Sequence, residues 1–93
     1  MFKTIEYKLK LTPYKIDEVL INDFYYINSE CIPRTNEIIE KIRIQVEDDN
    51  EKMNDYLLKV KIREVHYELF EDDSAMPVLY GDVIEIKKVE SDE

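Results

Sequence analysis

The arrangement that comes nearest to catalytic chemistry is the chain's only histidine, His66, with a glutamate two residues away on either side. Alternate side chains of a strand share a face, so Glu64, His66 and Glu68 would point the same way, opposite Val65 and Tyr67. An imidazole between carboxylates can act as a general base or bind a metal ion. The same spacing also describes an ordinary solvent-facing strand. We expect the solvent-facing strand, because a catalytic site needs a geometry that spacing alone does not define.

The other reactive side chains are isolated. Cys31 is the single cysteine, so no internal disulfide can form, and with His66 it offers zinc only two of about four ligands. We expect it to be a small buried apolar residue. The carboxylate runs at 48–51 and 71–73 lack the spacing and the glycine of a calcium loop, and a single glycine, Gly81, cannot form a phosphate-binding loop. These patterns predict neither an enzyme nor a cofactor or metal.

The chain has seven tyrosines and no tryptophan. Tyr25 and Tyr26 are adjacent, so in a strand they face opposite sides, and an exposed member of the pair would suit a protein interface. The tyrosines that fall in phase with apolar residues are expected in or beside the core, and they are Tyr7, Tyr56, Tyr67 and Tyr80.

The net charge of −9 is unevenly distributed along the chain. Residues 1–46 hold seven basic and seven acidic side chains, whereas residues 47–93 hold six basic and fifteen acidic ones. Nucleic-acid backbones are bound through Lys and Arg, so the acidic half is a poor match for DNA or RNA. A basic protein surface is a better electrostatic partner.

The first part of the chain favours strands. Residues 2–11 alternate between apolar and polar side chains and predict a half-buried strand that ends at Thr12-Pro13. Residues 14–32 fit either a helical stripe or short strands, and the turn-forming pairs Asn22-Asp23 and Asn28-Ser29 favour strands with tight connections. Residues 38–47 predict another strand, although their apolar side chains would also serve a short helix.

The second part has the longest continuous pattern. Its apolar phase changes from even to odd positions within residues 56–70, which a β-bulge near Arg63-Glu64 would repair by bending the strand. The polar segments at 47–55 and 71–76 are predicted loops, and residues 78–86 a last strand interrupted at Gly81-Asp82. Gly81 would allow a positive φ, a bulge or a close approach of a second backbone. An acidic tail follows from about residue 88, frayed from the body of the domain.

These elements predict one domain over residues 1–93, mainly β, with five or six strands. The fold would be a small antiparallel barrel or a strongly twisted sheet closing on itself, with one short helix as an optional addition. An α+β fold with a helix in 14–27 or 34–46 is the alternative.

Part of the chain resembles a known group of proteins. The segments Ile32-Pro33-Arg34-Thr35-Asn36-Glu37, Tyr56-Leu57-Leu58-Lys59-Val60 and Ile62-Arg63-Glu64-Val65-His66-Tyr67 are similar to small uncharacterised bacteriophage and mobile-element proteins. Those proteins pair a Pro-Arg-x-Gly-Glu turn with a later bent strand, and Asn36 stands where their pattern has glycine. The resemblance implies an SH3-like barrel and no particular activity.

The expected function is a non-enzymatic protein-binding module, an inhibitor or adaptor of a phage or mobile element that docks a basic partner. The alternative is a structural subunit of a virion or another homo-oligomeric assembly. No apolar run is long enough to span a membrane, and the single cysteine suits a reducing cytoplasm. The candidate partner-binding residues are Glu47, Asp48, Asp49, Glu51, Asp55, Glu71, Asp72, Asp73, Tyr25 and Tyr26.

Overall fold

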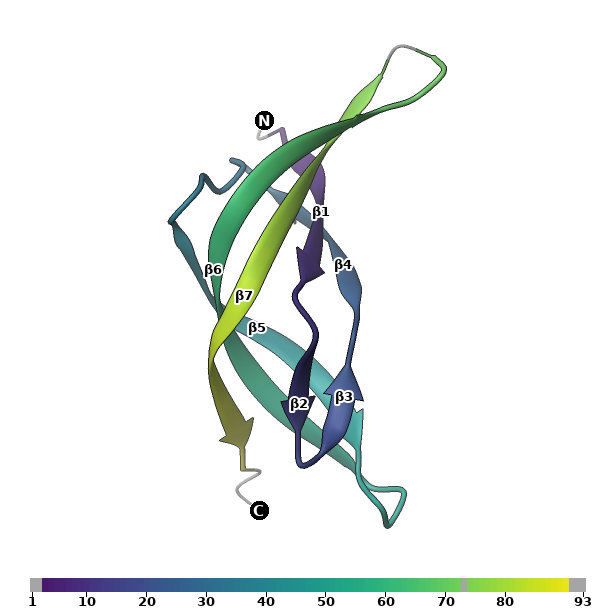
Figure 1. Ribbon diagram of the computed structural model, residues 1–93, viewed down its shortest axis with the longest axis vertical. Coiled ribbons are helices and arrows are strands. Elements are labelled where there is room, and N and C mark those ends of the chain that lie inside the picture. The colour runs from purple at the N-terminus through teal and green to yellow at the C-terminus, as the bar shows by residue number, and fades with distance from the viewer. Residues whose placement is uncertain (1–2, 73, 91–93) are drawn as a thin grey trace.

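The computed structural model describes residues 3–72 and 74–90, and its regular structure consists entirely of β-strands over those residues (Figure 1). The prediction of a mainly β chain is confirmed, and the helices considered at 14–27 and 34–46 are absent from the described residues. The strands are β1 (Ile5–Leu11), β2 (Tyr14–Ile16), β3 (Val19–Ile21), β4 (Phe24–Ser29), β5 (Ile38–Glu47), β6 (Met53–Leu69) and β7 (Ala75–Val89).

Five strands form one twisted sheet in the order β4-β1-β7-β6-β5, and β2 and β3 form a separate two-stranded hairpin. The sheet is open, with β4 and β5 as its two edges, so it is not a closed barrel. The expectation of a purely antiparallel sheet is wrong at one place, because β1 runs parallel to β7 through Lys8–Val78 to Leu11–Gly81. This pairing places the first and last strands of the chain side by side at the centre of the sheet.

Of the connections between the first four strands, only the one between β2 and β3 is a tight turn. Between β2 and β3, Asp17 and Glu18 both adopt positive φ, at 49° and 70°, the conformation of a two-residue hairpin turn matched to strand twist. Asn22 and Asp23 link β3 to β4, but the turn expected there is wrong, because β4 continues in the direction of β3 (Figure 1). The expected turn at Asn28-Ser29 is wrong, because both residues lie in β4 opposite Glu6 and Ile5 of β1.

Strand β5 has the predicted bounds and contains a bulge that its alternation did not indicate. Its register against β6 shifts between Ile39 and Ile42, and Lys41 within the shift has a φ of 63°. The extra residue turns Ile39 toward the core and leaves Ile38 51% exposed. A bulge therefore changes which of two adjacent isoleucines is buried.

The predicted bulge in β6 is confirmed. Ile62 pairs with Gly81 and Glu64 pairs with Tyr80, so Arg63 is the additional residue on β6. A second shift leaves Ile84 as the additional residue on β7. Strand β7 continues through Gly81 without interruption, so the expected break at Gly81-Asp82 is wrong.

Several loop bounds differ from the expected ones because strand pairing extends into polar sequence. Met53, Asn54 and Asp55 already pair with β5, and Ala75 and Met76 already pair with β6. Strand β7 also continues through Lys87 to Val89, so the tail expected from about residue 88 begins later than predicted. Residues 91–93 of that tail lie outside the described residues, as does residue 2 of the first predicted strand.

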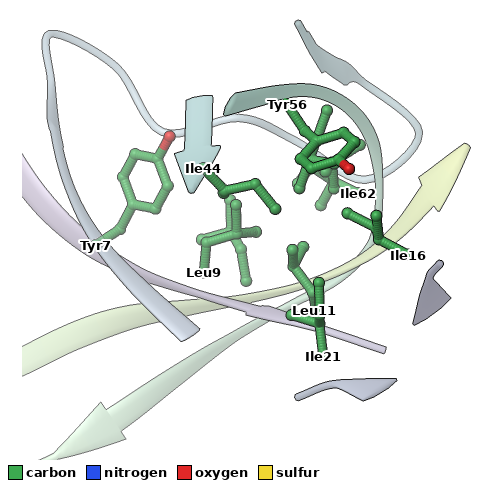
Figure 2. Packing of buried hydrophobic residues seen from close by; sticks show 11 residues of the cluster. Tyr7, Leu9, Leu11, Ile16, Ile21, Ile44, Tyr56 and Ile62 are labelled. Carbon is green, nitrogen blue, oxygen red and sulfur yellow. The ribbon is translucent and has the colours of Figure 1, made fainter. Parts of the chain in front are cut away.

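The core lies inside the curl of the large sheet, with the β2–β3 hairpin covering its lower part (Figure 1). Figure 2 shows side chains from β1, β2, β3, β5 and β6 converging on one interior. The hairpin is attached to β6 by a hydrogen bond, in which the Tyr56 hydroxyl donates to Asp17 Oδ2 at 3.2 Å. The innermost side chains, all under 2% exposed, are Leu9, Leu58, Val60, Ile62 and Leu79.

Candidate functional site

The two predicted acidic loops lie at opposite ends of the molecule. The molecule measures 46 Å along its longest axis, and Figure 1 shows the β6–β7 turn at the top of that axis and the β5–β6 turn at the bottom. The candidate carboxylates at 47–55 and 71–72 therefore form two separate surfaces. Asp73 lies outside the described residues.

One carboxylate of the β5–β6 turn, that of Asp48, is engaged in local structure. Asp48 Oδ1 accepts hydrogen bonds from the backbone amides of Asn50 and Lys52 at 2.9 Å and 3.0 Å, and Oδ2 accepts one from the Asn54 side chain at 3.1 Å. The Lys52 amide, followed by the Asn54 side chain, lowers the pKa of Asp48. Glu47, Asp49 and Glu51 are exposed around it. The turn is held by the carboxylate that we proposed as a binding group.

Asp55 also has a structural partner. Arg43 on the neighbouring strand β5 forms an ion pair with it and donates a further hydrogen bond from Nε to Asp55 Oδ2 at 3.2 Å. This hydrogen bonding lowers the pKa of Asp55. Asp55 is thus less available to a partner than its place in the sequence suggests.

We call the distal part of the β6–β7 hairpin, residues 64–80 except the undescribed Asp73, the arm. Its base is paired with β1 through Val78–Tyr80, and past that pairing it projects beyond the rest of the sheet (Figure 1). One face of the arm continues the core face, because Val65 pairs with the buried Leu79. Further along the same face, Tyr67 is 63% exposed and Leu69 is 78% exposed. The expectation that Tyr67 belongs to the core is wrong, because the core ends before the arm does. Phe70, after β6, is also exposed.

The arm carries negative charge and no positive charge. Residues 64–80 include five acids and neither Lys nor Arg. In the turn, Asp72 Oδ1 accepts hydrogen bonds from the amide and hydroxyl of Ser74, at 3.1 Å and 2.6 Å, which lower the pKa of Asp72. Glu71 beside it is exposed.

One edge of the arm is open. Strand β5 accompanies β6 as far as Lys61, and the Ile62 main chain is bonded to Asn36 and Glu37. From Arg63 to Leu69, β6 pairs only with β7 among the described residues, so its outer edge has no strand neighbour there. An unpaired edge offers backbone donors and acceptors to another chain.

The two candidate tyrosines lie away from the arm, on β4. As adjacent strand residues they face opposite sides, with Tyr26 56% exposed and Tyr25 half-buried against the core. The structure therefore does not bring Tyr26 together with the acidic turns.

His66 lies on the arm's other face and is exposed, as expected for a solvent-facing strand residue. Its Nε2 is 2.7 Å from Glu64 Oε2, and its ring meets Tyr80 edge to face at 5.0 Å between centroids. The contact with His66 lowers the pKa of Glu64. Within residues 3–72 and 74–90, no three His, Cys, Asp or Glu side chains gather as metal ligands. Cys31 is exposed, which contradicts its expected burial.

Comparison with models of protein families, with curated proteins and with solved structures finds no match for this chain. Across the part of the chain that the structure describes, no helix has the length and apolar character needed to cross a membrane.

Proposed function

We propose that this protein is a non-enzymatic protein-binding module whose arm docks a basic partner. The observation that carries the proposal is the combination, in one projecting hairpin, of an exposed apolar face, acidic side chains without basic ones, and an unpaired strand edge. This narrows the expected acidic surface from the whole second half of the chain to residues 64–80.

Strand addition is the binding mode that fits the arm best. An extended segment of the partner would pair with the open edge of β6 between Arg63 and Leu69, using main-chain hydrogen bonds for affinity. Its apolar side chains would cover Tyr67 and Leu69, each worth about 1.5–3 kcal/mol when fully buried. Basic side chains on its other face would meet Glu64 and Glu68, which share the opposite face of β6.

The same edge is less suited to a second copy of this chain, which is the basis of the alternative function as a homo-oligomeric structural subunit. If two β6 edges paired antiparallel about His66, Glu64 of one copy would lie opposite Glu68 of the other. Like charges directly opposite each other destabilise a strand pair. The acidic composition of the arm therefore favours a different, basic chain.

The biological form we propose is an inhibitor or adaptor encoded by a phage or mobile element and acting in the cytoplasm. Its support is the resemblance carried by Pro33-Arg34-Thr35-Asn36-Glu37 and the bent strand. Asn36 has a φ of 74°, a left-handed conformation that asparagine tolerates better than most residues, at the position where the related pattern has glycine.

The proposal can be tested with a defined peptide. Isotope-labelled protein is titrated with a short synthetic peptide of alternating valine and lysine, and with a matched peptide of alternating valine and glutamate, while backbone amide signals are followed by NMR. We expect the lysine peptide, and not the glutamate peptide, to shift the signals of residues 63–69. Added salt should weaken the binding of the lysine peptide.

Two variants distinguish docking through the arm from nonspecific hydrophobic binding. Leu69→Ser removes an exposed apolar side chain of the arm, and Leu20→Ser removes one that is 61% exposed in the β2–β3 hairpin. The first should weaken peptide binding several-fold and the second should not. Equal binding of the two peptides, or equal loss in the two variants, would refute docking through the arm. Light scattering that shows a concentration-dependent dimer broken by Leu69→Ser would favour the homo-oligomeric alternative.

A further inference from the structure

A second surface lies on the opposite, outer face of the sheet from the arm's apolar face. A shallow groove of about 510 Å³ runs over β1, the start of β4 and the middle of β7. Its walls combine cationic, hydroxyl and aromatic side chains, those of Lys8, Lys10, Thr12, Phe24, Arg63 and Tyr80. A groove of this volume is within the range of small-molecule sites.

Strand geometry places these side chains together. In β1 the buried Leu9 and Leu11 alternate with Lys8 and Lys10, so both ammonium groups leave the sheet on the outer face. Lys10 has Phe24 of β4 as its neighbour on one side and Tyr80 of β7 on the other. The central lysine of the groove thus lies between two aromatic residues.

The bulge in β6 adds the third cation. Arg63 is the residue without a counterpart on β7, and bulges can redirect a side chain out of the regular alternation. Its Nη2 donates to the Thr12 hydroxyl at 3.3 Å, and its Nε lies 3.5 Å from Asp82 Oδ2. Thr12 in turn donates to Asp82 at 2.6 Å, so this end of the groove is ordered.

The groove is positive on a chain of net charge −9. No carboxylate of the described residues lies within ion-pair distance of Lys8 or Lys10. Lys8 Nζ lies 4.3 Å from the centre of the Phe24 ring, a cation–π contact that holds the ammonium at the groove. Asp23 is the one carboxylate among the groove's lining residues. Two ammonium groups therefore remain available to an anion.

We propose that this groove binds a nucleotide, with its phosphate on Lys8, Lys10 and the Arg63 guanidinium and its base against Phe24 or Tyr80. Cations beside aromatic faces are the combination by which proteins bind nucleotide units without base-pair readout. The groove accommodates about one such unit, and the acidic remainder of the chain repels a long polyanion. The unit could be a free nucleotide or part of a short single strand. This site shares Tyr80 with the base of the arm, but it lies on the outer face of the sheet and does not depend on the function proposed for the arm.

The test uses adenosine 5′-monophosphate, inorganic phosphate and a short oligothymidylate as probes, with binding followed by calorimetry and by NMR of the labelled protein. Lys10→Gln should weaken binding of the monophosphate about tenfold, the loss of one charge-assisted contact. Phe24→Leu should weaken it several-fold and should weaken inorganic phosphate less, because phosphate loses only the contact that holds Lys8 at the groove. Lys15→Gln is the matched control, since Lys15 is exposed on β2 outside the groove, and should leave binding unchanged.

The probes separate the two sources of the nucleotide. Similar affinities for the monophosphate and the oligonucleotide would identify a free nucleotide as sufficient, whereas a tighter oligonucleotide with a steeper salt dependence would identify a single strand. Binding of phosphate as tightly as the monophosphate, with no effect of Phe24→Leu, would refute the nucleotide assignment. Equal losses in Lys10→Gln and Lys15→Gln, or no shift in groove signals with any probe, would refute the site.

Discussion

Gly81 should not tolerate even a methyl group, although its backbone does not require glycine. It has no positive φ and lies in the middle of β7, where alanine would ordinarily be acceptable. A Cβ at this position would overlap Val60 Cγ1 and lie 3.4 Å from the Lys61 carbonyl oxygen and 3.6 Å from Leu9 Cδ1. The obstacle is therefore the packing of β6 against β7, as in the close approach of a second strand that the sequence suggested.

The size of the effect follows from two opposing contributions. Replacing glycine with alanine restricts the unfolded chain and would stabilise the fold by about 0.4–1 kcal/mol. Forcing an additional carbon into a packed core costs about 1–3 kcal/mol. Val60 is fully buried and its methyl group has no free space to enter, so the second contribution is larger. We expect Gly81→Ala to lower the free energy of unfolding by about 1–2 kcal/mol.

Urea denaturation followed by circular dichroism measures this directly, with an unchanged dependence on denaturant showing that the surface exposed on unfolding is the same. In a thermal scan the same loss corresponds to a decrease in Tm of roughly 4–16 °C for a domain of this size.

A double mutant tests the stated cause. Val60→Ala removes the methyl group that the new Cβ would overlap, at a cost of its own of about 2 kcal/mol. We expect Gly81→Ala and Val60→Ala together to destabilise the protein by less than the sum of the two single changes, because they occupy the same space. A Gly81→Ala variant as stable as the wild type, or strictly additive losses, would refute the packing argument.

Two further predictions concern the bulge and the acidic turn. Deletion of Arg63 should leave a folded protein by circular dichroism, because it removes the additional residue of β6 and keeps Ile62 and Val65 facing the core. Deletion of Lys61 should unfold the protein, because it turns Ile62 outward. A folded Lys61 deletion together with an unfolded Arg63 deletion would disprove the assignment of Arg63 as the additional residue. Asp48→Asn should lower Tm near neutral pH, because the lowered pKa of Asp48 means that its carboxylate form stabilises the fold. The Tm difference from wild type should shrink as the pH falls below the unfolded pKa of about 3.9 toward the lower folded value, and a pH-independent difference would contradict this role.

Local patterns predicted the strands well where one periodic signal dominated. The alternation of Tyr7, Leu9 and Leu11 and the phase change at Arg63 both correspond to observed features. Alternation alone could not locate the bulge at Lys41, because Ile38 and Ile39 are equally apolar and only the pairing with Val60 determines which is buried. It also could not predict the parallel pairing of β1 and β7, which joins residues far apart in the sequence.

The candidate site was harder to predict, because sequence proximity does not place residues on one surface. The acidic runs are both adjacent to β6, yet a strand of 17 residues carries them to opposite ends of the molecule. Tyr67 lies on the face that the apolar phase predicted, but it is exposed because β6 extends beyond β5 at that point. The absence of Lys and Arg between Arg63 and Lys87 was the signal that could have identified the arm.

The bulge at Arg63 connects the two proposed surfaces. It lies where β5 stops pairing with β6, so it marks the start of the arm's open edge, and it turns the Arg63 guanidinium toward Thr12 and the groove. A regular strand would have lacked this additional side chain and the bend that accompanies it. A partner strand added at Arg63–Leu69 would therefore pair beside the residue that completes the groove. Occupation of one surface is expected to alter the NMR signals of Arg63 at the other, even though Leu69→Ser should leave nucleotide binding unchanged.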